Sequence, residues 1–498
     1  MTGSIRRVAA VVLVLFGALF VNLNYLQVVK ADDLASNNAN RRQLIADYEH
    51  ERGRILIGAG NATRPIAESV ETDGEFKYLR QYDPGSLYAH VTGFTSPLVG
   101  RSQVEQAFDQ ALTGNAPEAF ARNLADLMAG RERAGDAVHV TVREEVQQAA
   151  REALGDREGA VVALNPSTGA ILGMWSSPTY DPNDLASHDF DEVNAAWEQL
   201  QGDDDQPLLN RVVSETYPPG STFKLITAAA ALEDGMSPEQ TFPDPERLDL
   251  PETSASIGNF GGSLCNGGAP LSLIQAMTVS CNTTFAQLGI DLGSEALAEQ
   301  AGHFGFNDQW EFQLPQLAES VVPSDLDAPS TAQSAIGQRD VRTTPLQMAM
   351  VAAAIANDGV IMTPHVVDRV EDTSGRIIRE FRPQELRLPD HPNGQSVSSG
   401  TADTLTTMME SVVSSGSGQS AAISGVRVAG KTGTAQTGED RPPTVWFVGF
   451  APADNPTVAV AVVVPDGGGV GSEATGGAIA GPIASTVMQA ALDTETAQ

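Results

Sequence analysis

A serine and a lysine stand three residues apart in the stretch YPPGSTFKLITAAAAL, as Ser221 and Lys224. Pro218, Pro219 and Gly220 cannot continue a helix backwards, so the sequence predicts a helix that begins at about Ser221. Residues three apart on a helix share one face. A serine hydroxyl needs a neighbouring base to take its proton, and a lysine can be that base only when it is neutral. The pair therefore predicts a serine nucleophile with a lysine base.

The surroundings of Lys224 favour its neutral form. The residues that follow it, LITAAAAL, are apolar on every face of a helix, which predicts a buried central helix. Burial disfavours the charged ammonium, and so does the positive end of the helix dipole, because Lys224 lies in the first turn. Taken alone, the pair also has an ordinary interpretation, with Ser221 as a helix cap and Lys224 along the surface.

Two later motifs favour the catalytic interpretation. Ser280 and Asn282 belong to an S-x-N motif in AMTVSCNTTFAQLG, which we expect in a loop between two helices. The motif KTGT, residues 431–434, lies in a strand-like run before VWFVGF. S-x-x-K, S-x-N and K-T-G in this order mark serine acyl-transfer enzymes that react with β-lactams.

The elements that must position these motifs surround them in the chain. Five strand-like apolar runs lie at the two ends of the region after residue 157, at Gly159–Asn165, Ala170–Ser176, Val426–Gln436, Thr444–Pro452 and Thr457–Pro465. Between them, at about 220–360, the pattern is mostly helical, and Ala478–Asp493 predicts a closing helix. A sheet with a helical lobe inserted places a cleft between the two parts, where ligand sites are preferred.

Residues 30–156 predict a small first domain of mixed structure. Glu51–Gly60 is a short apolar run, and Gly100–Gly114 has helical spacing between glycines. Val140–Gly155 changes from a strand-like pattern to a helix that ends at its glycine. We expect the second domain at residues 157–493.

The N-terminus predicts the compartment. Residues 8–29 carry no charge, and about 20 apolar residues span a bilayer. Arg6 and Arg7 precede this run, so residues 1–7 are expected in the cytoplasm and the rest of the chain beyond the membrane. A cleaved signal peptide is the alternative, although its apolar region would span only about 7–15 residues and no clear A-x-A site follows here. Both interpretations export the chain.

The composition excludes two classes of function. The 498 residues include 30 Lys and Arg against 63 Asp and Glu, for a net charge of −33, whereas a nucleic-acid partner requires basic contacts. The sequence has two cysteines and seven histidines, with no CxxC pair and no HExxH motif. We therefore expect no nucleic-acid partner, no metal and no cofactor.

With these motifs, the chain resembles a class B (monofunctional) penicillin-binding protein of the actinobacterial type, a peptidoglycan D,D-transpeptidase. Similar stretches cover nearly the whole chain, at Glu51–Ile55, Tyr88–Phe94, Asn165–Asn183, Ala335–Ala349 and Trp446–Pro452. The resemblance implies an α+β fold: a five-stranded antiparallel sheet flanked by helices, an inserted all-helical lobe, a small N-terminal pedestal domain and one transmembrane helix. Cys281 inside the S-x-N motif and the short pedestal depart from the family pattern.

The resemblance also implies a role for each motif residue. Ser221 would attack the carbonyl of the penultimate D-Ala of a stem peptide and release the terminal D-Ala, with Lys224 as the base. Ser280 would relay the proton towards the leaving amine, and Asn282 would hold the substrate amide. An amine from a neighbouring stem peptide would then resolve the acyl-enzyme and leave a cross-link.

The KTGT residues would bind the terminal carboxylate of the substrate. Lys431 would act through its charge, Thr432 and Thr434 through their hydroxyls, and Gly433 belongs to the same segment. The backbone N–H groups of Ser221 and Thr434 would form the oxyanion hole. β-lactams would acylate the same serine, and a SEDS-type glycosyltransferase is the partner that the family implies for a role in cell wall synthesis, division or shape.

Other functions share part of this motif set. A class A β-lactamase needs a glutamate in an E-x-x-L-N pattern after the nucleophile, whereas Gln206–Asn210 lacks the acid and precedes Ser221. A bifunctional glycosyltransferase needs a whole further domain before residue 157. A D,D-carboxypeptidase and a non-enzymatic β-lactam-binding scaffold of the cell-wall machinery stay open as alternatives.

The two cysteines flank the expected site. Cys265 and Cys281 are 16 residues apart in an exported chain, where a disulfide can form. Two buried free thiols are the alternative.

Overall fold

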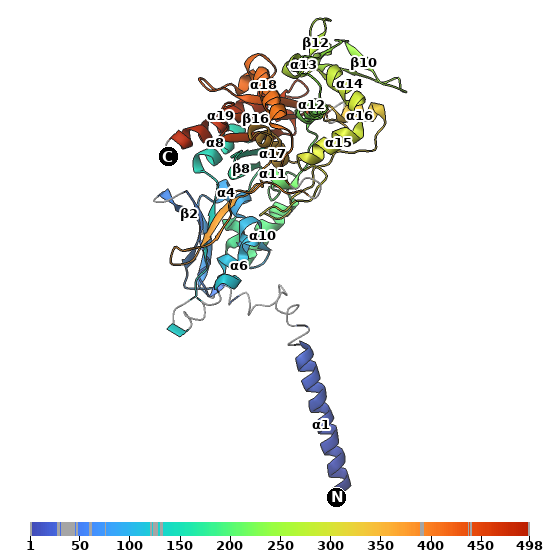
Figure 1. The fold of residues 1–498 in the computed structure, drawn as a ribbon. Helices are drawn as coiled ribbons and strands as arrows, with labels where there is room; N and C mark the ends of the chain where they lie inside the picture. Colours follow the sequence, from blue (N-terminus) through green and yellow to red (C-terminus); the bar gives the residue numbers. More distant parts are fainter. Residues whose placement is uncertain are drawn as a thin grey trace.

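The computed structural model describes residues 2–26, 30, 45, 48–58, 62–74, 76–119, 122, 128–129, 133–388, 393–436, 438 and 441–496. Helix α1 (Thr2–Asn24) contains an apolar span, Ile5–Asn24, that is long enough to cross a membrane and is exposed throughout (Figure 1). The span begins earlier than the predicted 8–29, and residues 27–29 lie outside the described residues. One apolar N-terminal helix is consistent with a membrane anchor or a signal sequence.

A five-stranded antiparallel sheet forms the centre of the larger domain, as predicted. Its order is β15-β16-β17-β7-β8, with strands at Ala429–Ala435, Thr444–Ala451, Val458–Val464, Gly159–Leu164 and Ile171–Ser177. The runs from both ends of the domain meet where β17 pairs with β7. The side chains of β7, β8, β16 and β17 are buried on both faces, which explains their continuous apolar sequences.

Helices cover both faces of this sheet (Figure 1). One face contacts α8 (Glu144–Leu154) and the closing helix α19 (Gly476–Thr496). The other face contacts α11 (Arg211–Ser214) and α17 (Pro345–Ala356), and α18 (Ser399–Ser415) packs on β15. Strand β15 lies at the edge of the sheet, so one side of its backbone faces the helical lobe instead of another strand.

The inserted lobe is mostly helical. Its helices are α12 (Lys224–Glu233), α13 (Leu273–Val279), α14 (Asn282–Leu292), α15 (Ser294–His303) and α16 (Ala328–Ser334). The prediction of an all-helical lobe missed two small ribbons, which pair β9 (Thr241–Phe242) with β12 (Leu271–Ser272) and β10 (Arg247–Asp249) with β11 (Ser256–Gly258). These strands are two or three residues long, too short to give an alternating pattern.

The N-terminal domain is built on a six-stranded sheet. Its order is β14-β13-β6-β1-β2-β3, with strands at Ile377–Glu380, Val367–Glu371, Ala137–Val140, Ile55–Ile57, Arg64–Glu71 and Tyr78–Tyr82. The domain also contains α4 (Gly85–Thr92), β4 (Thr95–Ser96), β5 (Gly100–Arg101), α5 (Gln103–Ala107) and α6 (Asp109–Leu112). Two of the six strands, β13 and β14, come from far along the chain and appear in orange beside the blue strands (Figure 1).

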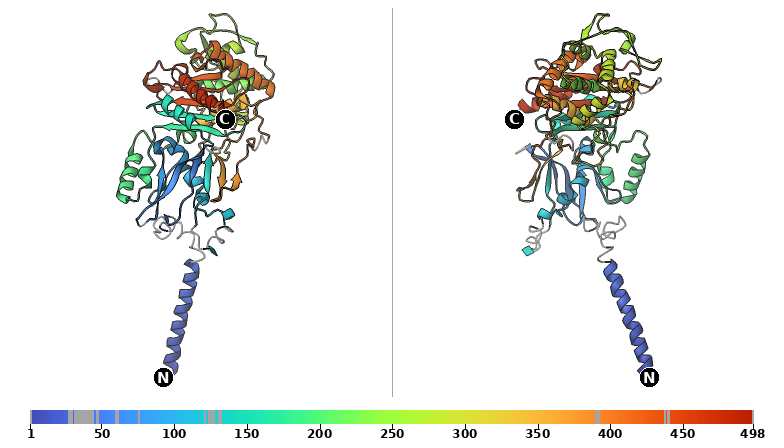
Figure 2. Two further views of the ribbon diagram at one scale, coloured as in Figure 1. Left: turned by 90° about the vertical axis from the view of Figure 1, so that its left-hand side faces the viewer. Right: turned by 45° about the vertical axis from the view of Figure 1, so that its right-hand side comes forward.

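The structure therefore differs from a division into contiguous domains at residue 156. The hairpin β13–β14 pairs with β6 through backbone hydrogen bonds of β13, and no local sequence pattern predicts this pairing. The segment with α9 (Asn183–Ala186) and α10 (Phe190–Gly202) also packs on the N-terminal domain (Figure 2), where Trp197 and Leu185 join a cluster with Phe94.

A buried glutamine joins the two domains. Gln147, on α8, donates to the carbonyl oxygens of Leu87 on α4 (2.9 Å) and Met174 on β8 (2.8 Å). Its side-chain oxygen accepts from the Met174 N–H at 2.8 Å. Since all three bonds are buried, Gln147 fixes α8 between the N-terminal domain and the central sheet.

Candidate active site

Ser221 lies in a tight turn that precedes a buried helix. Residues Gly220–Phe223 form a 3₁₀ turn, and α12 begins at Lys224, so the predicted helix start is correct in place and its first turn is 3₁₀. Gly220 has a φ of 53° and donates its N–H to Gly337 at 2.9 Å. A Cβ on Gly220 would lie 2.8 Å from the Thr434 carbonyl oxygen, so the turn is seated directly against β15. This contact places the half-buried Ser221 beside the edge strand.

Lys224 is completely buried and held by three oxygen acceptors. Its Nζ donates to the Ser280 carbonyl (2.7 Å), to Asn282 Oδ1 (2.8 Å) and to Ser280 Oγ (3.3 Å). The Phe285 ring centre lies 5.5 Å from the same nitrogen. Burial, followed by the charge of Lys431, holds the Lys224 pKa well below its ordinary value. A lysine of this kind can exist as the neutral amine that a general base must be.

Ser280 occupies the left-handed bend between α13 and α14. Its φ is 62°, and it is the C-terminal cap residue of α13, while α14 begins two residues later at Asn282. The predicted position between two helices is therefore what the structure has. A non-glycine residue in this conformation is strained and is often found at functional sites. The bend brings the Ser280 hydroxyl between Lys224 and Lys431.

Lys431 is the second buried lysine of the site. From β15, its Nζ donates to Ser280 Oγ at 2.8 Å and to the Thr432 carbonyl at 2.9 Å. Burial lowers its pKa to about 7. Lys224, Ser280, Asn282 and Lys431 therefore form one hydrogen-bonded group that was assembled from three distant segments of the chain.

The rest of the KTGT motif lies along the edge strand. The Thr432 hydroxyl is 2.6 Å from the Ser417 hydroxyl, and Thr434 Oγ1 accepts a weak bond from the Gly476 N–H at 3.4 Å. A Cβ on Gly433 would lie 2.8 Å from the Pro219 carbonyl oxygen, so the turn before Ser221 leaves no room for a side chain there.

Two residues that hold the site carry no motif that the sequence could have shown. Ser417 follows α18 and contacts Thr432, and Asn259 follows β11 and contacts the start of α14. Both are ordinary polar loop residues in the sequence. Their positions are found only when the loops are folded onto the motif, because neither lies near its contact along the chain.

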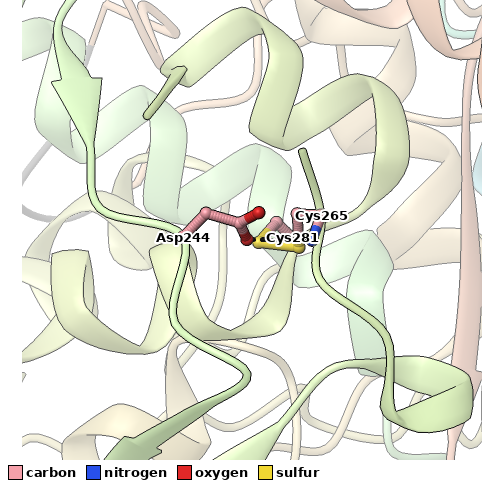
Figure 3. Close-up of side chains that lie close together, drawn as sticks. All are labelled: Asp244, Cys265 and Cys281. Atoms are coloured by element: carbon pink, nitrogen blue, oxygen red, sulfur yellow. Dashed lines mark hydrogen bonds between the residues drawn. A yellow bond between two sulfur atoms is a disulfide. The ribbon is translucent and has the colours of Figure 1, made fainter. Parts of the chain in front are cut away.

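Cys265 and Cys281 form a disulfide beside Asp244 (Figure 3). These three residues are close enough together to suggest metal ligation. Each sulfur is bonded to the other, however, and the Asp244 carboxylate accepts three backbone N–H bonds, from residues 265, 266 and 268. Because metal-binding sulfur is a free thiolate, this group does not fit a metal ion.

Comparisons with known proteins find similar domains, sequences and structures. A family model described as "Penicillin binding protein transpeptidase domain" matches residues 159–489, and one described as "Penicillin binding protein A dimerisation domain" matches residues 52–138. The peptidoglycan D,D-transpeptidase PbpA of Mycolicibacterium smegmatis is 44% identical over 503 residues, covering 99% of each chain. The solved ceftriaxone acyl-enzyme complex of penicillin-binding protein A from Mycobacterium tuberculosis is 41% identical, with a TM-score of 0.85, and covers 90% of this chain and 100% of that one. The penicillin G acyl-enzyme complex of the same protein has a TM-score of 0.83 at 40% identity, covering 89% and 100%.

Proposed function

The chain belongs to the penicillin-binding protein transpeptidases, and we propose that Ser221 is the nucleophile and Lys224 the base of its peptidoglycan D,D-transpeptidase reaction. The chain is a serine acyl-transferase of this family, and β-lactams acylate it as they acylate its solved relatives. The observation that carries the assignment is the burial of Lys224, with a lowered pKa, one 3₁₀ turn after Ser221.

Acylation begins with the neutral Lys224 amine. Lys224 takes the Ser221 proton as Oγ attacks the carbonyl carbon of the penultimate D-Ala. The amide bond to the terminal D-Ala then breaks, and Ser280 passes its proton to the departing nitrogen while it takes up the proton held by Lys224. The Ser280 hydroxyl contacts both lysines, which supports this relay. The product is an ester between Ser221 and the shortened donor peptide.

The substrate carboxylate binds along β15. Lys431 supplies positive charge, and the hydroxyls of Thr432 and Thr434 donate hydrogen bonds to the carboxylate oxygens. Asn282 holds the donor amide, and the close packing of Gly433 against the turn keeps the strand within reach of Ser221. The backbone N–H groups of Ser221 and Thr434 stabilise the oxyanion that forms during attack.

Resolution of the ester requires an amine. The amino group of a neighbouring stem peptide attacks the ester carbonyl, Lys224 accepts the proton of that amine, and Ser221 leaves with a proton. The new amide is the cross-link of the cell wall. Water in place of the amine would give carboxypeptidase activity, which the exchange experiment below measures separately.

The apolar helix α1 supports an anchored arrangement. Arg6 and Arg7 within α1 favour a cytoplasmic N-terminus, with the chain held in the cell membrane by a single pass and the catalytic domain beyond it. There it meets peptidoglycan stem peptides ending in D-Ala-D-Ala. A SEDS-type glycosyltransferase is the partner we expect at α1 and the N-terminal domain, by analogy with the family, in cell wall synthesis during division or shape maintenance.

An exchange assay tests this function. The full-length protein in detergent is given a stem pentapeptide that ends in D-Ala-D-Ala, together with a labelled D-amino acid as acceptor, and mass spectrometry follows both products. We expect release of D-Ala with incorporation of the acceptor. Ser221→Ala should abolish both, whereas Ser237→Ala, on a surface turn, should change neither. D-Ala release without incorporation would indicate a carboxypeptidase, and no release with retained penicillin binding would indicate a scaffold.

A further inference from the structure

The loop that follows β11 lies over the S-x-N motif without the support of a hydrophobic core. Residues 259–268 include four glycines, and two of its large apolar side chains, Phe260 and Leu264, are 59% and 41% exposed. A loop of this composition has high conformational entropy when it is free. Its position must therefore come from specific polar and covalent contacts.

Three hydrogen bonds hold the far end of this loop on Asp244, and one disulfide joins it to the motif. The Asp244 carboxylate accepts the backbone N–H groups of Cys265 (2.8 Å), Asn266 (2.6 Å) and Gly268 (3.0 Å). Cys265 is bonded to Cys281, which is the middle residue of the S-x-N motif itself (Figure 3). The loop and the motif therefore cannot separate at this point without breaking a covalent bond.

The near end of the loop is tied through Asn259. Its Oδ1 accepts the backbone N–H groups of Asn282 (2.9 Å) and Thr283 (3.1 Å), the first two residues of α14. The first N–H groups of a helix have no partner within the helix. A side chain at the cap position usually takes this role, but the cap residue here is Cys281, whose sulfur is in the disulfide. Asn259 supplies the cap from another segment.

The same segment orients the amide of Asn282. Asn282 Nδ2 donates to the Gly258 carbonyl at 3.1 Å, so that its Oδ1 faces Lys224 Nζ at 2.8 Å. If the amide turned over, its NH₂ group would meet the Lys224 amine, and its oxygen would meet the Gly258 carbonyl. The second contact would set one acceptor against another, and the first would occupy the lone pair that the neutral Lys224 amine needs as a base.

From these contacts we infer that Asn259 is a positioning residue for acyl transfer: it holds Asn282 so that the Asn282 oxygen fixes the Lys224 amine, and the Cys265–Cys281 bond holds Asn259 in place. Asn259 touches no reacting atom and acts through Asn282. Asn259 lies outside the three motifs S-x-x-K, S-x-N and K-T-G, so the motifs do not assign this role.

The test compares three single variants by the rate of penicillin acylation across pH. Asn259→Ala removes the cap and lets the first residues of α14, including Asn282, shift, so the plateau rate should fall on the order of 10- to 100-fold, the usual cost of small misplacement at a reacting centre. Asn259→Asp keeps an oxygen that accepts both N–H groups, so the plateau should be largely restored. Its added negative charge favours protonated Lys224, so the acid limb should move to higher pH. Asn266→Ala, in the same loop, removes side-chain bonds to the Ala269 and Pro270 carbonyls and keeps the backbone bond to Asp244, so it should match the wild type.

Removal of the disulfide is a second, independent test of the inference. Cys265→Ser with Cys281→Ser should lower the plateau in the same direction as Asn259→Ala, and adding Asn259→Ala to that pair should cause little further loss, because both changes release one loop. A wild-type acylation rate for Asn259→Ala would overturn the inference. So would an unmoved acid limb in Asn259→Asp if its acylation rate falls only in proportion to its thermal stability. Strictly additive losses of rate in the triple variant would overturn it as well.

Discussion

Lys224 and Lys431 donate hydrogen bonds to the same atom, Ser280 Oγ, at 3.3 and 2.8 Å. Both lysines are fully buried. Two ammonium groups that share one oxygen repel each other, so the positive charge on Lys431 lowers the pKa of Lys224 in addition to burial. The group therefore favours one charge over two, with the neutral amine on Lys224.

This coupling predicts a bell-shaped pH dependence of penicillin acylation. The Lys224 pKa is depressed, so the rate should rise with pH as Lys224 loses its proton. The Lys431 pKa is lowered to about 7, so the rate should fall above about pH 7 as the charge that attracts the carboxylate is lost. Stopped-flow measurement of acylation between pH 4 and pH 10 checks the shape. A flat profile would contradict the assignment of both lysines.

Replacing Lys431 should move the acid limb. Lys431→Met removes the charge that disfavours protonated Lys224, so the Lys224 pKa should rise and the acid limb should shift to higher pH. The overall rate should fall as well, because the carboxylate loses its cation. Lys431→Arg keeps the charge and serves as the control, with the limb expected near its wild-type position. An unshifted limb in Lys431→Met would show that the two lysines are not coupled.

Ser280→Ala should slow acylation with little effect on folding. The variant removes the shared oxygen and the proposed proton relay, and loss of a positioned acid–base group typically costs on the order of 100-fold or more. Ser411→Ala, a serine on α18 that bonds Thr278 outside the lysine group, is the matched control and should keep the wild-type rate. The acylation rates and melting temperatures of both variants test this prediction. An acylation rate of Ser280→Ala equal to that of the wild type would show that Ser280 takes no part in the mechanism.

Gly433→Ala should impair the site more than the fold. The new methyl group would lie 2.8 Å from the Pro219 carbonyl and 2.9 Å from Trp446 Cβ, so the turn that carries Ser221 must move away from β15. Overpacking of this kind costs about 1–3 kcal/mol. Gly400→Ala on α18, where a Cβ meets nothing within 4 Å, should be neutral or stabilising. Comparison of acylation rates and melting temperatures tests the contrast, and wild-type acylation by Gly433→Ala would contradict it.

Gln147→Ala should loosen the junction between the domains. The substitution leaves the buried Leu87 and Met174 carbonyls and the Met174 N–H without their partner. Each unsatisfied buried group costs about 1–3 kcal/mol, so a clear drop in the melting temperature is expected. Gln148→Ala, exposed on the next position of α8, should be nearly neutral. A small effect of Gln147→Ala would show that water replaces the lost bonds.

Local patterns in the sequence were sufficient to predict the central sheet and the motif positions. The five apolar runs became β7, β8, β15, β16 and β17, and Ser280 lies between two helices as expected. These features depend on residues that are neighbours in the chain. The S-x-x-K and K-T-G segments could be assigned to one site because their order along the chain is typical of serine acyl-transfer enzymes.

Other features depend on tertiary contacts and left no local signal. The hairpin β13–β14 joins the N-terminal sheet because β6 offers it an open edge, which no pattern in residues 367–380 reveals. Asn259 and Ser417 are polar loop residues whose contacts lie 23 and 15 positions away. The 3₁₀ turn at Gly220 is fixed by its packing on Thr434 and Gly337, so the α-helical pattern begins only at Lys224.

The most direct test of Ser221 as the nucleophile is the intact mass of the full-length protein during incubation with penicillin G, beside Ser221→Ala and Ser237→Ala. One covalent adduct is expected to persist for many minutes in the wild type and in Ser237→Ala and to be absent from Ser221→Ala. A persistent adduct on Ser221→Ala, or rapid hydrolysis of the drug with no adduct on the wild type, would contradict the role of Ser221 in forming the acyl-enzyme.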